Sequence, residues 1–111
     1  MTNLAGVPMD KYEIHLMRHP WNGCGDPRPW VIVDFPAGRN VVGCLPVATQ
    51  CYGGDCFYVS ETHPDFDATG LDHSSNIIDE YIIEVPGNSV IRYFGVLTGS
   101  LLQEFKAHTG L

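Results

Sequence analysis

The fold of this chain is decided by the stretch Trp30-Val31-Ile32-Val33-Asp34-Phe35. This short apolar run is typical of a strand buried on both faces or nearly so. The turn Pro36-Ala37-Gly38-Arg39-Asn40 follows it, and a second strand is predicted over residues 41–49. Pro46 lies inside that second strand. Because proline cannot donate a hydrogen bond to a neighbouring strand, we expect an edge position or a bulge there.

Patterns on both sides of this pair extend the β-rich interpretation. Residues 11–17 alternate, with Ile14 on one face and His15 on the other, which predicts a half-buried strand. Prolines and glycines predict a loop over residues 19–29. The remaining predictions are a Gly-Gly turn over 51–56, a short strand over 57–60, a polar excursion over 61–75, an isoleucine-rich strand over 77–85, a turn over 86–88, and a helical turn with a last short strand within 89–97.

A final helix is predicted over residues 99–108. Thr98 is its expected cap, since a threonine hydroxyl accepts a hydrogen bond from a free backbone N–H of the first turn. Gly110 is its expected stop. The apolar face would consist of Leu101, Leu102 and Phe105. Together these elements predict a mainly β fold, a small barrel of five to six strands with a C-terminal helix.

Length and charge limit the possible organisation and partners. The chain has 111 residues, so we expect one domain over residues 1–111, with 1–10 as a flexible lead. Its formal net charge of -7 argues against indiscriminate binding to nucleic acid or acidic membranes. The basic residues are uneven in sequence, because residues 40–91 contain none. Either the first third forms a locally basic wall of a groove, or the asymmetry averages out in three dimensions.

The chain shows no secretory signal and no apolar run of the roughly 18 residues that a membrane span needs. We therefore expect a cytoplasmic protein without a membrane partner. Four cysteines in such a protein are expected to be free thiols rather than a disulfide framework.

Three segments, in order, resemble the MazF/PemK family of toxin ribonucleases. The first is Arg28-Pro29-Trp30-Val31-Ile32-Val33, an Arg-Pro before an apolar strand. The second is Leu45-Pro46-Val47-Ala48-Thr49-Gln50, an apolar strand that ends in threonine. The third is Thr69-Gly70-Leu71-Asp72-His73-Ser74-Ser75, followed by a strand over 76–85 and by Phe94-Gly95-Val96-Leu97. The match covers nearly the whole chain from Lys11 onward.

The resemblance implies an SH3-like barrel that forms a homodimer and binds single-stranded RNA in grooves along the dimer. It also implies a toxin of a toxin–antitoxin system, whose cognate antitoxin has a disordered segment. Such hydrolases are endoribonucleases that need no metal or other cofactor. The 2′-OH of the substrate attacks the adjacent phosphate and leaves a 2′,3′-cyclic phosphate and a 5′-OH.

Two residues are the expected catalytic groups by this resemblance. Arg28 would stabilise the charge on the phosphorane, since its planar guanidinium pairs two phosphate oxygens. Thr49 would donate a hydrogen bond to the same oxygens. The expected substrate-binding residues are Arg18 and His19 for phosphate or proton transfer, Trp21 for base stacking, and Gln50 and Ser75 by their place in the motifs.

Departures from the family pattern keep two alternatives open. The loop over 21–27 lacks the family's glutamate, and Tyr81 and Ile83 stand where family members often carry glutamine and arginine. A catalytically weakened barrel kept as an interaction module would fit these departures. The other alternative is a zinc-binding small barrel, whose ligands would come from Cys24, Cys51, Cys56, His63, Asp65, Asp67 and His73.

Overall fold

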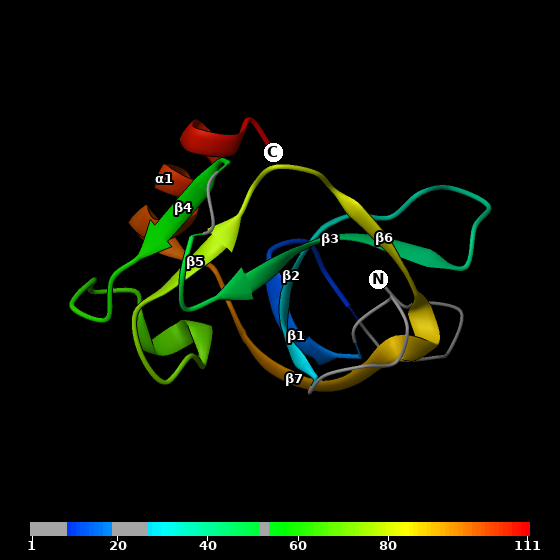
Figure 1. Cartoon of the computed structure of the whole chain (residues 1–111), viewed down its shortest axis with the longest axis horizontal. Helices are drawn as coiled ribbons and strands as arrows, with labels where there is room; N and C mark the ends of the chain where they lie inside the picture. The colour runs from blue at the N-terminus through cyan, green and yellow to red at the C-terminus, as the bar shows by residue number, and fades with distance from the viewer. Residues whose placement is uncertain (1–8, 19–26, 52–53) are drawn as a thin grey trace.

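A computed structural model describes residues 9–18, 27–51 and 54–111 of the chain. These residues form a mainly β fold with one C-terminal helix, as the sequence predicts (Figure 1). The described part has seven strands rather than five or six. Its elements are β1 (Glu13–Met17), β2 (Arg28–Asp34), β3 (Val41–Ala48), β4 (Cys56–Val59), η1 (Asp67–Thr69), β5 (Ser75–Ile78), β6 (Ile83–Pro86), η2 (Gly87–Ser89), β7 (Val90–Val96) and α1 (Gly99–Thr109).

Strand β3 joins the two ends of the sheet. The strands follow the order β4-β5-β3-β2-β1-β7, all pairs are antiparallel, and β6 pairs with β3 outside this path. In Figure 1, β4, β5 and α1 lie together at one end of the molecule, and β3 runs from them toward β6. Pro46 pairs with Trp30 on one side. On its other side, β3 pairs with β6 over residues 41–44 and with β5 over residues 47–48. Pro46 lies between these two stretches.

Of the two alternatives expected for Pro46, an edge position or a bulge, the edge position is wrong, because β3 is a central strand. Proline is tolerated there since the change of partner leaves a gap in the ladder. The predicted single strand over 77–85 is wrong for a related reason. Six positions separate Ile77 from Ile83, whereas three separate their β3 partners Val47 and Cys44. The extra residues leave the sheet as a bulge over 79–82, which divides β5 from β6.

Strand β2 is buried on both faces, as predicted. Trp30, Val31, Ile32 and Val33 are each no more than 3% exposed. Successive side chains of a strand point to opposite faces, so β2 contributes alternately to two hydrophobic clusters. One cluster contains Val31 and Val33 with residues of β3, β4, β5 and α1, and the other contains Trp30 and Ile32 with residues of β1, β3 and β6.

The N-terminal part of the second cluster includes Met9, which is 1% exposed. This residue belongs to the expected flexible lead over 1–10, of which residues 1–8 lie outside the described part. Met9 instead packs in the core.

Strand β1 is not half-buried, contrary to the prediction. It lies between β2 and β7, and His15 is 1% exposed although the alternation placed it with the polar residues. The His15 Nε2 lies 2.9 Å from Glu13 Oε1, and the ring meets Tyr93 edge-on at a centroid distance of 5.4 Å. Within the described residues the buried His15 Nδ1 has no hydrogen-bond partner.

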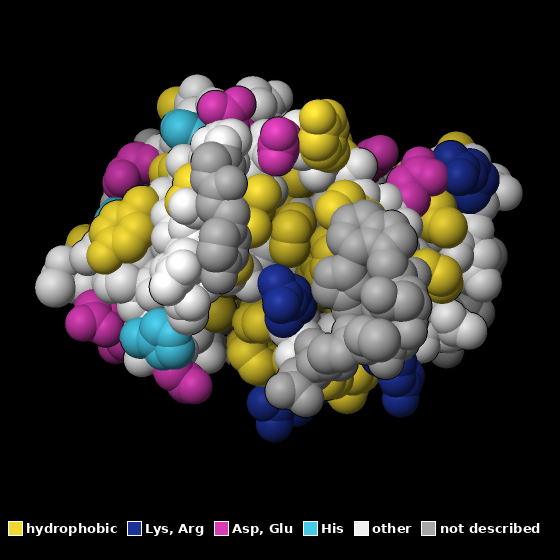
Figure 2. Space-filling view, viewed as in Figure 1, with side chains coloured by type: hydrophobic (Ala, Val, Ile, Leu, Met, Phe, Trp, Pro, Cys, Tyr) yellow, Lys and Arg dark blue, Asp and Glu magenta, His cyan; other side chains and the backbone are white. Residues whose placement is uncertain are grey.

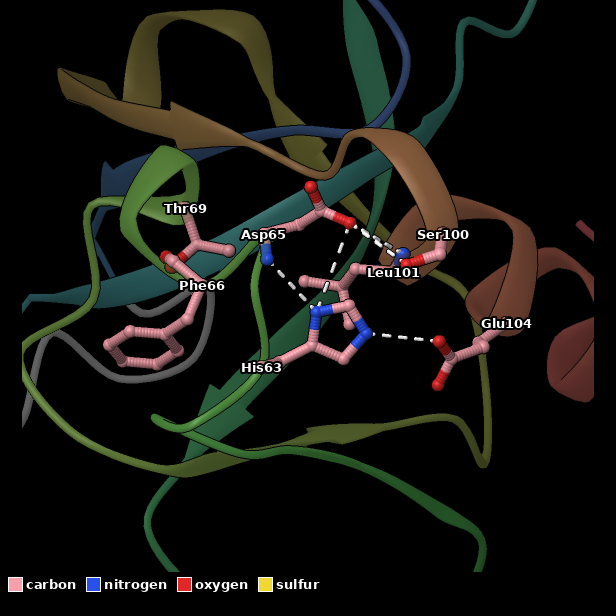
Figure 3. A network of polar contacts seen from close by, with 7 residues as sticks. All are labelled: His63, Asp65, Phe66, Thr69, Ser100, Leu101 and Glu104. Atoms are coloured by element: carbon pink, nitrogen blue, oxygen red, sulfur yellow. Dashed lines mark hydrogen bonds and ion pairs between the residues drawn. The ribbon is translucent and has the colours of Figure 1, made fainter.

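Helix α1 occupies the predicted residues and buries Leu101 and Phe105. Gly110 ends it with φ of 75°, and its N–H donates to the Lys106 carbonyl at 2.8 Å. Thr98 stands at the N-cap, but its hydroxyl makes no capping hydrogen bond, which corrects the prediction. Asp65 supplies the cap, because its Oδ2 accepts from the Leu101 N–H at 3.2 Å and from Ser100 Oγ at 3.0 Å (Figure 3).

Two of the cysteines form a disulfide, so the prediction of free thiols is wrong for them. The Cα atoms of Cys51 and Cys56 lie 6.1 Å apart, within the range that a disulfide spans. Cys44 is buried and free. Cys24 lies outside the described residues. The described chain contains no helix with the length and hydrophobicity of a membrane span.

Candidate functional site

A cavity of about 270 Å³ lies where β1 and β3 end and β2 begins, beside the excursion over 61–75. We call it the Thr49 cavity. Its polar lining residues are Thr49, Asp72, His73 and Ser75, and its apolar ones include Leu16, Pro29 and Phe94. The antiparallel pairing of β3 with β5 brings Thr49 and Ser75 together, and Asn76 Nδ2 donates to the Thr49 carbonyl at 3.3 Å.

The serine predicted to bind substrate has a structural contact. Ser75 is 5% exposed, and its Oγ donates to the His73 carbonyl at 2.9 Å. This bond fixes the turn that presents His73 to the cavity. Asp72 and His73 were missed as site residues by the sequence reasoning, which placed His73 only among possible metal ligands. Both residues stand just before Ser75 in the third motif, and this position could have indicated that they belong to the site.

The excursion that carries His73 is held to the rest of the fold at two places. His63 Nδ1 accepts from the Asp65 N–H at 3.0 Å, so its Nε2 carries the hydrogen donated to Glu104 Oε2 of α1 at 2.9 Å (Figure 3). At the other place η1 lies directly on β7, because a Cβ on Gly95 would come within 2.2 Å of the Ala68 carbonyl oxygen. The cavity wall is therefore preformed.

Arg28 lines a different cavity, of about 280 Å³, with Trp30, Pro46, Ile78, Glu80, Tyr81 and Ile83. The strand alternation explains this separation, since Arg28 and Trp30 face one side of β2 while Pro29 faces the Thr49 cavity. The two expected catalytic residues thus line separate cavities rather than one. Tyr81 and Ile83, which depart from the family pattern, line the cavity of Arg28.

A third cavity, of about 350 Å³, is lined by Gly70, Asp72, Arg92, Tyr93 and Phe94. We call it the Arg92 cavity. It shares Asp72 and Phe94 with the Thr49 cavity, so the two are contiguous. The Arg92 guanidinium carbon lies 5.0 Å from the centroid of the Phe94 ring. No sequence motif pointed to this arginine.

Three arginines gather at one end of neighbouring strands. Arg18 directly follows β1, while Arg28 pairs with Met17 and Arg92 with Leu16. The described residues provide no salt bridge to any of the three. Figure 2 shows acidic side chains mainly toward the left and upper margins of one face, with most basic side chains at its centre and lower edge.

Of the arginines in the first third of the chain, Arg18 and Arg28 lie near each other at one end of β1 and β2, whereas Arg39 does not; the basic wall stays a prediction. Arg39 lies in the turn at the other end of β2 and pairs with Glu84, its two terminal nitrogens 2.6 and 2.9 Å from the carboxylate oxygens. Arg92, distant in sequence, lies at the same end of the sheet but on the opposite face from Arg28, because Leu16 pairs with both Pro29 and Arg92.

The other predicted binding residues are less informative. Arg18 and Gln50 are exposed, and Gln50 follows Thr49 directly at the end of β3. His19 and Trp21 lie outside the described residues. Their assignment to substrate stays a prediction.

The zinc alternative is not favoured. Cys51 and Cys56 are joined to each other, so they offer no thiolate ligand. In the ranges that the structure describes, no group of three or more His, Cys, Asp and Glu residues is placed to hold a metal ion. Asp65, another proposed ligand, is engaged in capping α1.

No protein-family model matches the chain, and no curated protein matches it either. A solved structure does match: the Mycobacterium tuberculosis toxin MazF-mt6, with a TM-score of 0.65 and 19% sequence identity. The similarity covers 88% of this chain and 92% of that one. The chain therefore shares the fold of that structure.

Proposed function

We propose that the chain is the toxin of a toxin–antitoxin pair and an endoribonuclease that cleaves single-stranded RNA without a metal ion. The observation that carries this proposal is the Thr49 cavity, placed on a MazF-like fold beside arginines that have no salt bridge among the described residues. We further propose that the protein acts in the cytoplasm as a homodimer, with an antitoxin that has a disordered segment.

The proposed reaction is an internal transfer at phosphorus. The 2′-oxygen loses its proton and forms a bond to the adjacent phosphorus, while the bond from phosphorus to the 5′-oxygen breaks and that oxygen takes up a proton. The products are a 2′,3′-cyclic phosphate and a 5′-OH. The protein must stabilise the charge that develops on the phosphate oxygens and must move two protons.

Thr49 and Arg28 are the proposed donors to the phosphate. The Thr49 hydroxyl lines the cavity, and Arg28 is exposed at the start of β2, next to Pro29 of the cavity wall. His73 is the proposed proton-transfer group, because histidine is the side chain best suited to exchange protons near neutral pH. The described residues give its ring no hydrogen-bond partner, so its nitrogens are available to substrate.

The test is cleavage of a long single-stranded RNA by the purified protein in EDTA. We expect discrete cuts with cyclic phosphate ends, and about a 10²-fold loss of rate in Thr49→Ala, the cost of removing one charge-stabilising donor. Arg28→Ala should lose at least as much, while Arg39→Ala should cleave normally because that guanidinium is held by Glu84 away from the cavity. Intact RNA at high protein concentration would refute the enzyme.

His73→Gln tests the proton-transfer role separately. We expect a lower kcat with a nearly unchanged KM, and a flatter dependence of kcat on pH. A profile identical to that of the unmodified protein would assign His73 no part in the chemistry.

One observation favours the interaction module as a second candidate. The bulge over 79–82 presents Tyr81 and Ile82 to solvent, 71% and 45% exposed. Large exposed apolar side chains mark protein contact sites. In that case Tyr81→Ser would weaken binding of the antitoxin peptide, and the unmodified protein would leave RNA intact.

A further inference from the structure

We propose that the Arg92 cavity is a second nucleotide subsite, in which Arg92 binds an RNA phosphate next to the one held in the Thr49 cavity. The inference rests on the proposed function in taking single-stranded RNA as the ligand. It adds a binding residue and the direction that the strand takes from the Thr49 cavity.

The first argument is the charge of Arg92. The chain carries a formal net charge of -7, yet within the described residues Arg92 forms no salt bridge. Its guanidinium is positioned over the Phe94 ring, 5.0 Å from the centroid, and both side chains line the cavity. A guanidinium that is oriented by an aromatic ring and free of a carboxylate partner is suited to bind the two oxygens of a phosphate.

The second argument is continuity with the Thr49 cavity. Asp72 and Phe94 line both cavities. The strand register also places the two cavities next to each other. Leu16 of β1 pairs with Pro29 of β2 on one side and with Arg92 of β7 on the other. Two strand spacings, about 10 Å, therefore separate Pro29 in the Thr49 cavity from Arg92. A polymer that enters one cavity reaches the other along this row.

The third argument is the orientation that Asp72 imposes. A carboxylate repels phosphate but accepts hydrogen bonds from the amino groups of bases. In the Arg92 cavity, Asp72 and Arg92 are both lining residues without a salt bridge between them. The phosphate is thus directed to Arg92 and a base amino group to Asp72.

The walls of this cavity are held in place before any ligand binds. A Cβ on Gly70 would lie 2.1 Å from the Phe94 carbonyl oxygen, so the end of η1 rests directly on the β7 backbone. The Thr69 hydroxyl also donates to the Phe66 carbonyl at 2.6 Å, which closes this turn. Ligand binding therefore does not have to order the loop that carries Asp72.

The test is fluorescence anisotropy with a labelled single-stranded 2′-O-methyl oligonucleotide, which has no 2′-OH and cannot be cut. Arg92→Ala should weaken binding about tenfold, and the slope of log K against log salt should become shallower by about 0.7, the value for one lost phosphate contact on a single strand. Arg92→Lys should keep most of the slope, since the charge stays. Arg39→Ala is the matched control and should change neither quantity.

Arg92→Gln guards against a folding defect, because it keeps a long polar side chain without the charge; it should behave like Arg92→Ala with an unchanged thermal transition. Equal affinity and slope in the unmodified protein and both neutral variants would overturn the subsite. Cleavage is assayed separately on RNA. If the RNA stays intact while the Arg92 variants bind the oligonucleotide more weakly, the proposed ribonuclease activity is refuted and the subsite stands. If Arg92→Ala cuts RNA normally and its binding is unchanged, only the subsite is refuted.

Discussion

Asp65 caps a helix that lies 36 residues further along the chain, because its Oδ2 accepts from the Leu101 N–H at 3.2 Å. The Ser100 hydroxyl donates to the same oxygen at 3.0 Å. These donors, the Leu101 N–H first, hold the pKa of the Asp65 carboxyl below its usual value. One carboxylate thus fastens the excursion that carries His73 to α1.

We expect Asp65→Ala to lower the thermal transition at pH 7. The pKa of Asp65 is lowered in the folded state, so its contribution is complete above the unfolded pKa and is lost as the pH falls through the folded value. The difference in transition temperature between variant and unmodified protein should therefore shrink from pH 7 to pH 2. Asp67→Ala is the control, because the Asp67 side chain lies in the same excursion and makes no hydrogen bond or salt bridge within the described residues.

A methyl group at Gly95 should disrupt the packing of η1 on β7. Its Cβ would lie 2.2 Å from the Ala68 carbonyl oxygen and 2.4 Å from the Thr69 carbonyl carbon, and neither backbone group can move away like a side chain. We expect Gly95→Ala to reduce the free energy of unfolding by about 3 kcal/mol or more, measured by urea denaturation.

Gly38→Asn is the comparison for the Gly95 variant. Gly38 has φ of 72° with no atom within 4 Å of its Cβ position, and asparagine tolerates that backbone conformation. It should change the free energy of unfolding by no more than about 0.5 kcal/mol. Equal effects of the two substitutions would show that η1 does not rest on β7.

Reduction of Cys51–Cys56 should destabilise the protein without unfolding it. The bond joins positions five residues apart, and closing so short a loop contributes about 2 kcal/mol in the chain-entropy account. The urea midpoint should fall on addition of a thiol reductant, and Cys51→Ser/Cys56→Ser should show the lower midpoint with no response to reductant. Alkylation of both cysteines in the unreduced, unfolded protein would contradict the bond.

Cys44 should be inert in the folded protein. Burial raises the pKa of its thiol to about 12, so the reactive thiolate is scarce at pH 8. The Sγ also donates to the Ile83 carbonyl at 3.4 Å. We expect iodoacetamide to label Cys44 only after unfolding, as followed by mass spectrometry of its peptide. Rapid labelling under native conditions would show that β3 and β6 separate there.

The elements that the sequence predicts well are those decided by local pattern. The apolar run at Trp30 predicts a strand buried on both faces. The spacing of Leu101 and Phe105, with Gly110 after them, predicts α1. Both patterns can be recognised within a few consecutive residues. No local sequence pattern indicates which strand pairs with β1 at His15. Its burial results from β7, which comes near the end of the chain.

The candidate site is predicted less completely, because it depends on contacts between segments that are distant in sequence. Thr49 and Ser75 meet as the motifs imply, whereas Arg28 turns to the other face of β2 through strand alternation. Arg92 and the Asp65 cap depend on contacts between distant segments. Neither residue stands in a local pattern that distinguishes it from an ordinary surface charge.

The alternation of β2 between the two hydrophobic clusters has a consequence for the lifetime of the protein. Each cluster takes every second side chain from the same strand, Val31 for one and Trp30 for the other, and β3 divides its residues likewise. We therefore expect opening of β2 or β3 to expose both clusters at once. Proteolysis within these two strands should then follow the global unfolding equilibrium rather than local fraying.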